Sequence, residues 1–217
     1  MGHVRKKISG EEFDYQALIG ALKEYKQPRD KITALLRQGT IVRVKKGIYI
    51  FGKDLAQRPY SREVLANMIF GPSYISLDYA LHYHGIIPER SEALTCVTPG
   101  RAKRFSTPVG LFIYRGIPPH AYPVGMDQIQ TEGNRSFLIA TAEKALADKI
   151  YTDRGTGLRS QKELKEYLLN HMRVDPDFFK KVNLNLLKKI SAGYQSRKIL
   201  LLYRLTASLT KEMKKYE

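Results

Sequence analysis

Apolar residues near the start of the chain recur at helical spacing, three or four positions apart. The apolar positions of this first run are Tyr15, Leu18, Ile19 and Leu22. Such a stripe is typical of the buried face of an amphipathic helix, which we predict over residues 14–26. Pro28 follows closely and interrupts the pattern. It suits the first turn of a new helix, where its missing N–H would have no partner.

The second helical pattern covers about residues 29–38. Its expected core face is formed by Ile32, Leu35 and Leu36. Gly39 follows directly, in a position where glycine commonly ends a helix. We therefore expect two short helices joined by a tight connection.

Two short runs of β-branched and aromatic residues come next, at residues 40–44 and 48–51. A turn that ends in Gly47 separates them, and glycine can supply the positive φ of a tight hairpin. The order of helix, helix and hairpin predicts a winged helix-turn-helix at the N-terminus. We assign residues 1–58 to this domain.

Residues 59–153 combine helical and strand-like patterns. We expect a helix over residues 61–70, a short strand, and a further helix that Ser76 caps. Strand-like runs follow at residues 93–98, 103–107, 110–115, 122–131 and 135–140. Glycine or proline separates most of these runs, which predicts an α+β core domain with a mainly antiparallel sheet.

The remainder of the chain has helical spacing. Helical patterns cover residues 142–151, 161–171, 177–182, 184–190 and 194–216. The last pattern has an apolar stripe with lysines and arginines beside it, as in an amphipathic helix. We assign residues 154–217 to a basic C-terminal helical region, and the whole chain to the α+β class.

The formal charge of the chain is +16, and it is unevenly distributed. Residues 1–60 carry 13 basic and 6 acidic side chains, residues 61–153 carry 9 of each, and residues 154–217 carry 15 and 6. Both ends are therefore basic and the middle is neutral. A basic surface attracts polyanions because neutralised phosphates release condensed counterions. This favours nucleic acid as the partner, with an anionic membrane surface as the second choice.

Several features favour a cytoplasmic protein. No apolar run approaches the ~18 residues of a membrane span, and no apolar stretch follows the basic start of the chain as it would in a signal peptide. The single cysteine, Cys96, allows no internal disulfide, which fits a reducing compartment. We expect Cys96 to be a small buried residue.

In a helix-turn-helix, the second helix presents its outer face to the major groove. Placing Ile32, Leu35 and Leu36 inward turns the polar residues outward. The expected DNA-contacting residues are Arg29, Asp30, Lys31, Thr33, Arg37 and Gln38 on the helix and Arg43, Lys45 and Lys46 on the wing. The wing residues would bind the DNA backbone or minor groove and add affinity more than sequence information. The alternative is a solvated face of a small interaction domain.

Catalytic patterns are weaker. His82 and His84 lie two apart in a helical pattern and would point away from each other. Asp148, Asp153 and residues 163–165 could be fitted to a Mg²⁺-dependent nuclease, but positions two apart in a helix diverge. The sequence has neither a phosphate-binding GxxxxGK[ST] loop nor a GxSxG serine. We expect no enzyme, and therefore no catalytic residue, cofactor or metal site.

Three stretches resemble motifs of the AbiEi antitoxins, the regulators of type IV toxin–antitoxin pairs. Residues 39–49, GTIVRVKKGIY, resemble the family's G-x-I-x-R-x-x-x-G-x-Y. Residues 74–89, YISLDYALHYHGIIPE, are similar to Y-I-S-L-E-S-A-L-x-x-x-G-L-I-P-E, with Asp78 and Tyr79 in place of the Glu-Ser pair. Residues 142–148, AEKALAD, resemble E-K-A-L-x-D.

The resemblance implies a transcriptional autoregulator that binds double-stranded DNA at inverted repeats in its own promoter. It also implies an antitoxin that counters a nucleotidyltransferase-like toxin during abortive phage infection, a role in which the two proteins need not touch. Two alternatives stay open. One is a ligand-sensing transcriptional regulator without a toxin partner, and the other is a DNA-associated metal-dependent nuclease using acidic residues near 143–163.

Overall fold

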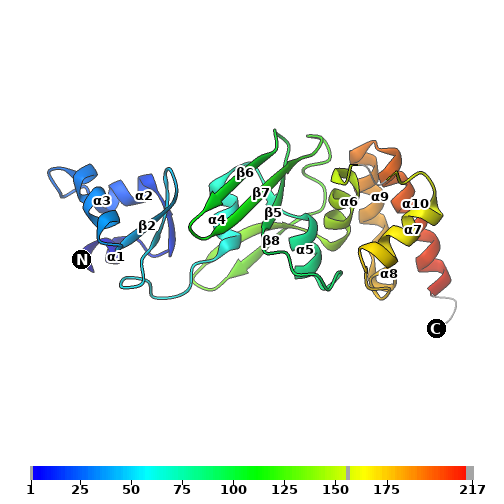
Figure 1. Cartoon of the computed structure of the whole chain (residues 1–217), viewed down its shortest axis with the longest axis horizontal. Helices are drawn as coiled ribbons and strands as arrows, with labels where there is room; N and C mark the ends of the chain where they lie inside the picture. Colours follow the sequence, from blue (N-terminus) through cyan, green and yellow to red (C-terminus); the bar gives the residue numbers. More distant parts are fainter. Residues whose placement is uncertain (1, 155–156, 214–217) are drawn as a thin grey trace.

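The computed structural model describes residues 2–154 and 157–213. Its three parts follow one another along the long axis of the molecule (Figure 1). A small sheet with short helices forms the N-terminal part, a larger sheet the middle part, and a group of helices the C-terminal part. This composition confirms the predicted α+β class. No helix in the described ranges is long and apolar enough to span a membrane.

The N-terminal part forms around short helices and a hairpin. Its elements are α1 (Gly2–Lys7), β1 (Glu12–Asp14), α2 (Tyr15–Ala21), α3 (Pro28–Arg37), β2 (Ile41–Lys45) and β3 (Ile48–Phe51). Asp14 begins α2, because its carboxylate accepts a hydrogen bond from the backbone N–H of Ala17 at 2.8 Å. Pro28 occupies the first turn of α3, as predicted. Gly47 has a φ of 88° in the hairpin turn, where its lack of a side chain is needed.

Two elements of this part are missing from the prediction. α1 buries Val4 and Ile8, and β1 extends the hairpin to a sheet of order β1-β3-β2. Phe13 lies in β1 opposite Tyr49, and its ring centroid is 4.6 Å from that of Phe51. Both elements are too short for a periodic pattern to reveal them.

The middle part is built on a six-stranded sheet of order β6-β7-β5-β4-β9-β8. Its elements are α4 (Arg62–Ile69), β4 (Tyr74–Ile75), α5 (Leu77–Tyr83), β5 (Leu94–Thr98), β6 (Lys103–Thr107), β7 (Gly110–Gly116), β8 (Met126–Thr131) and β9 (Arg135–Ala140). β4 pairs with β9 and β5 with β7 in parallel, while the other neighbours are antiparallel. The sheet predicted to be mainly antiparallel is therefore mixed, with three antiparallel and two parallel pairings between its described strands. A strand pattern records which side chains are buried but not the direction of the neighbouring strand.

The start of α5 also differs from its prediction. Ser76 occupies the N-cap position with an extended backbone, but its side chain makes no capping hydrogen bond. Its hydroxyl instead donates to Oδ2 of Asp148 at 2.6 Å. The predicted capping role of Ser76 is wrong, because a hydrogen bond to a buried carboxylate is stronger than one to a helix terminus.

The C-terminal part is helical, as predicted. Its elements are α6 (Ala142–Thr152), α7 (Gln161–Glu166), the π-helix η1 (Tyr167–His171), α8 (Phe178–Lys181), α9 (Leu184–Tyr194) and α10 (Arg197–Met213). The long final helix of the prediction begins too early, because α9 continues to Tyr194. Gln195, with a φ of 49°, ends α9 before α10 starts at Arg197. Residues 214–216 of the predicted helix lie outside the described residues.

The buried side chains form two hydrophobic cores. One lies within the N-terminal part. The other runs from Leu65 to Leu209 and is shared by the middle and C-terminal parts. The predicted domain boundary after residue 153 therefore crosses a continuous core. Val44 and Ile50 of the hairpin also pack in this second core, which attaches the hairpin to the middle part.

Candidate nucleic-acid interface

α3 separates buried from exposed residues. Ile32 and Leu35 are only 4% and 2% exposed and belong to the N-terminal core. Five of the predicted DNA-contacting residues are exposed on the other face: Arg29, Asp30, Thr33, Arg37 and Gln38. Lys31 is half-buried, as is Leu36. The structure thus brings the predicted helix residues together on one polar surface.

Few internal contacts engage the charged groups of this surface. The Thr33 hydroxyl donates to the backbone oxygen of Arg29 at 3.2 Å, and the Lys31 ammonium lies 5.3 Å from the centroid of the Tyr25 ring. Within residues 2–154 and 157–213, the guanidinium groups of Arg29 and Arg37 make no hydrogen bond or ion pair. Both groups are therefore available to an external ligand.

The three predicted wing residues occupy different surroundings. Arg43 and Lys46 are exposed, with the Arg43 guanidinium 6.0 Å from the Tyr49 ring centroid. Lys45 turns inward instead, where its ammonium donates to the backbone oxygen of Ile69 at 2.6 Å and lies 4.4 Å from the Phe105 ring centroid. These contacts attach the hairpin to the middle part.

An irregularity in the hairpin explains why Lys45 points to a different side from Arg43 and Lys46. The register between β2 and β3 shifts between Arg43 and Lys45. Such a bulge changes the side of the sheet to which the following side chains point. The exposed basic set of the wing is therefore Arg43 and Lys46, and Lys45 belongs to the junction between the two parts.

A buried acidic residue forms the rest of this junction. The Glu12 side chain is 1% exposed, and its Oε1 accepts a hydrogen bond from Arg135 Nη1 of β9 at 2.6 Å. The backbone N–H of Ser61, which precedes α4, donates to the same oxygen. Glu12 thus connects the N-terminal sheet to two elements of the middle part.

Replacing Arg135 with alanine is expected to reduce the free energy of unfolding by about 3 kcal/mol, because Glu12 would keep a buried charge without its ion-pair partner. Chemical denaturation with urea measures the change. The matched control is Arg173→Ala, which removes an ion pair to Glu89 whose side chains are 62% and 48% exposed. That pair should contribute at most about 1 kcal/mol. Equal losses in the two variants would contradict the role of Glu12.

A buried polar cluster lies deeper in the molecule, around Asp148 of α6. Lys144 and Asp148 are both fully buried, and Lys144 Nζ lies 2.8 Å from Asp148 Oδ1. Asp148 Oδ2 accepts hydrogen bonds from Ser76 at 2.6 Å and Tyr74 at 3.1 Å, and Tyr194 of α9 donates to Oδ1. Lys144 Nζ also donates to the backbone oxygen of Ala121 at 2.9 Å. The cluster joins the sheet, α6 and α9.

Burial changes the acid–base properties of this cluster. It lowers the pKa of Lys144, an effect that the adjacent Asp148 opposes. It raises the pKa of the Tyr74 and Tyr194 hydroxyls, and the negative charge of Asp148 adds to that increase. Both tyrosines therefore stay protonated and act as hydrogen-bond donors. The cluster is closed to solvent, which suits a structural role.

The sequence offers one signal for this cluster. Lys144 and Asp148 are four residues apart in a helical run with alanine and leucine between them, so both point to the same face. Their partners Tyr74, Ser76 and Tyr194 come from distant segments, and no local pattern identifies them.

The acidic residues of the nuclease alternative have separate roles. Asp148 belongs to the buried cluster, and Asp153 lies 3.5 Å from Lys149 Nζ. Glu163 accepts a hydrogen bond from the backbone N–H of Ser160 at 3.0 Å and closes the N-terminal cap of α7. In the part of the chain that the structure describes, no group of three or more His, Cys, Asp or Glu residues could hold a metal ion.

His84 and Cys96 fit simple structural roles. His84 Nε2 lies 2.8 Å from the backbone oxygen of Ala140, whereas His82 lines a surface pocket. Cys96 is completely buried in β5, as expected, and burial raises the pKa of its thiol.

Comparison with known proteins adds no assignment. No protein-family description matches this sequence, and a search of characterised proteins found no significant match.

Proposed function

We propose that residues 1–58 form a winged helix-turn-helix domain that binds double-stranded DNA, with α3 as the recognition helix. The observation that carries this proposal is the exposed polar face of α3, where Arg29 and Arg37 have no internal partner within the described ranges. The adjacent hairpin adds the exposed cations Arg43 and Lys46. A rigid helix beside a basic hairpin is the arrangement with which such domains enter the major groove.

The residues of this surface have different expected roles. Arg37 can donate two hydrogen bonds to the O6 and N7 atoms of guanine, and Gln38 can pair with adenine. The smaller Thr33 allows the helix to approach the bases closely. Arg29, Lys31, Arg43 and Lys46 bind phosphates and position the domain on the duplex.

We further propose that the chain acts as an autoregulator and antitoxin of the AbiEi type, which counters a nucleotidyltransferase-like toxin without requiring a stable complex. The buried cluster supports this resemblance. Two of the resembling stretches are about 70 residues apart in sequence, yet Tyr74 and Ser76 of one contact Asp148 of the other. Motifs that meet in this way are expected when they belong to one conserved scaffold.

DNA recognition is tested by measuring the binding of the purified full chain to the duplex upstream of its own gene. A scrambled duplex of the same length and composition is the control. A specific regulator should bind the upstream duplex at least about 10³-fold more tightly at physiological salt. Equal affinities for the two duplexes would contradict the proposal.

The antitoxin role has its own test. The chain is co-expressed with a nucleotidyltransferase-like toxin, taken from the gene next to its own where that gene encodes one, and bacterial growth is followed. Rescue of growth by the wild-type chain supports the antitoxin, and continued arrest at equal toxin levels contradicts it. A variant with Arg37→Ala should still rescue if antitoxicity does not depend on DNA reading.

A further inference from the structure

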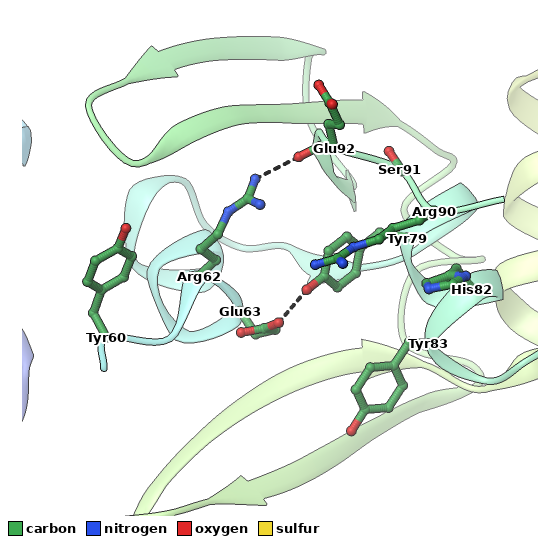
Figure 2. Close-up of a pocket in the computed structure, with 9 residues that line it drawn as sticks. All are labelled: Tyr60, Arg62, Glu63, Tyr79, His82, Tyr83, Arg90, Ser91 and Glu92. Carbon is green, nitrogen blue, oxygen red and sulfur yellow. Dashed lines mark hydrogen bonds between the residues drawn. The ribbon is translucent and has the colours of Figure 1, made fainter. Parts of the chain in front are cut away.

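A surface pocket of about 770 Å³ lies in the middle part, between α4, α5 and the segment that follows α5. Figure 2 shows the side chains that line it, including Tyr60 and Arg62 at one end and Tyr83 and His82 at the other. Pockets of this size accommodate small organic ligands. Aromatic side chains and a few fixed polar groups of the protein bind such ligands.

Arg62 is held rigidly at the edge of this pocket. Its Nη2 donates to the backbone oxygen of Glu92 at 2.8 Å, and its guanidinium lies 5.9 Å from the Phe112 ring centroid. Gly110 leaves room for it, since a Cβ at that position would come within 2.9 Å of Nη2. The buried Nε has no hydrogen-bond acceptor among the described residues. Arg62 therefore offers a fixed positive charge at the edge of the pocket, while its unsatisfied Nε is closed to solvent.

A second arginine approaches the pocket from the segment after α5. Arg90 is exposed and, in the described ranges, makes no hydrogen bond or ion pair. In Figure 2 its guanidinium extends over the pocket beside Tyr79. Arg62 and Arg90 line the same pocket, and guanidinium groups are suited to bind phosphate oxygens.

An ionised carboxylate forms another fixed group of the pocket. Glu63 accepts hydrogen bonds from the Tyr79 hydroxyl and, at 2.7 Å, from the Ser61 hydroxyl. Burial of the carboxyl acts to raise its pKa, but these hydrogen bonds hold the pKa of Glu63 below its ordinary value. The remaining lone pairs of this carboxylate can accept the N–H groups of a heterocyclic base.

Two aromatic side chains remain open to solvent at the pocket. Tyr60 is 40% and Tyr83 is 47% exposed. A tyrosine ring can stack on the flat face of any nucleobase, and each such stack contributes about 1–3 kcal/mol.

We propose that this pocket binds a nucleoside phosphate. Its phosphate lies between Arg62 and Arg90, its base stacks on Tyr83 or Tyr60, and Glu63 accepts an N–H of the base. The pocket alone supports this inference, which is independent of the proposed DNA-binding surface on α3.

The test uses isothermal titration of the full chain with the four ribonucleoside monophosphates, their nucleosides and inorganic phosphate. At least one monophosphate should bind saturably with a Kd below about 1 mM, and its nucleoside and free phosphate at least about tenfold more weakly. The absence of saturable binding by every monophosphate would overturn the proposal.

Two variants locate the binding site. Arg90→Gln and Tyr83→Ala alter exposed side chains, so both proteins should fold, and each should weaken binding at least about tenfold. Arg204→Gln removes the same charge from α10, which lies at the far end of the molecule from α4 (Figure 1), and should bind like the wild type. If Arg90→Gln and Arg204→Gln weaken nucleotide binding equally, the nucleotide is attracted nonspecifically to a basic protein. That result would overturn the proposal.

Discussion

Replacing Lys144 with methionine is expected to lower the free energy of unfolding by about 3–5 kcal/mol. The methionine fills similar space, but Asp148 would then keep a negative charge in a fully buried position without its cationic partner, which lies 2.8 Å away in the native chain. The hydroxyls of Tyr74, Ser76 and Tyr194 compensate this charge only in part, because they are neutral donors.

Urea denaturation measures this loss, and a neighbouring lysine provides the control. Lys149→Met removes ion pairs to Asp78 and Asp153 at 3.0 and 3.5 Å, but these side chains are partly exposed. That change should cost at most about 1 kcal/mol. If the two methionine variants are equally stable, Lys144 and Asp148 are not the electrostatic centre of the core.

A double-mutant cycle separates charge from packing. Asp148→Asn removes the negative charge but keeps an oxygen that can accept from the surrounding hydroxyls. The double variant Lys144→Met/Asp148→Asn should be more stable than the sum of the single losses predicts, by about 1–3 kcal/mol. Additive losses would show that the two side chains act independently.

The affinity for duplex DNA is expected to fall roughly 100-fold between about 50 and 200 mM monovalent salt. Four basic side chains of α3 and the hairpin are assigned to phosphates: Arg29, Lys31, Arg43 and Lys46. Each neutralised phosphate contributes about −0.9 to the slope of log affinity against log salt concentration, so the total slope should be about −3.6. A slope near zero would exclude these phosphate contacts.

Two adjacent lysines provide a matched comparison for the salt experiment. Lys46→Gln should reduce the size of the slope by about 0.9, since it removes one phosphate contact. Lys45→Gln carries the same change of charge, but Lys45 donates to the Ile69 backbone oxygen inside the molecule. It should leave the slope unchanged. An equal effect of both variants would mean that Lys45 reaches DNA in solution.

The sequence predicts the elements in which apolar and polar residues recur with a regular period. α3 and the hairpin follow from their spacing, and Asp14 and Pro28 mark the helix starts correctly. The predicted end of the first helix at residue 26 is wrong, because α2 ends at Ala21. The short β1 escapes detection because its three residues are stabilised by pairing with β3, about 35 positions later. The sequence does not reveal that the Lys45 side chain points inward, because this orientation depends on a bulge and on a contact with another part of the chain.

The candidate sites also differ in how far the sequence predicts them. The exposed face of α3 is predictable because one helix supplies all of its residues. The buried cluster is half predictable, from the spacing of Lys144 and Asp148, while the contribution of Ser76 requires the fold. The pocket is not predictable, since Arg62 and Arg90 come to line one pocket only after α4 and the segment beyond α5 have packed on the sheet.

The most direct test asks whether α3 recognises DNA sequence. Two alanine variants, Arg37→Ala and Lys46→Ala, are titrated with the duplex upstream of the gene and with its scrambled control. Arg37→Ala should weaken binding to the upstream duplex by about 1–3 kcal/mol and binding to the scrambled duplex by less, because it removes a base contact. Lys46→Ala should weaken both by the same factor, because every duplex presents phosphates. If Arg37→Ala lowers the two affinities in equal proportion, Arg37 does not read bases, and the assignment of α3 as a recognition helix through this residue is wrong.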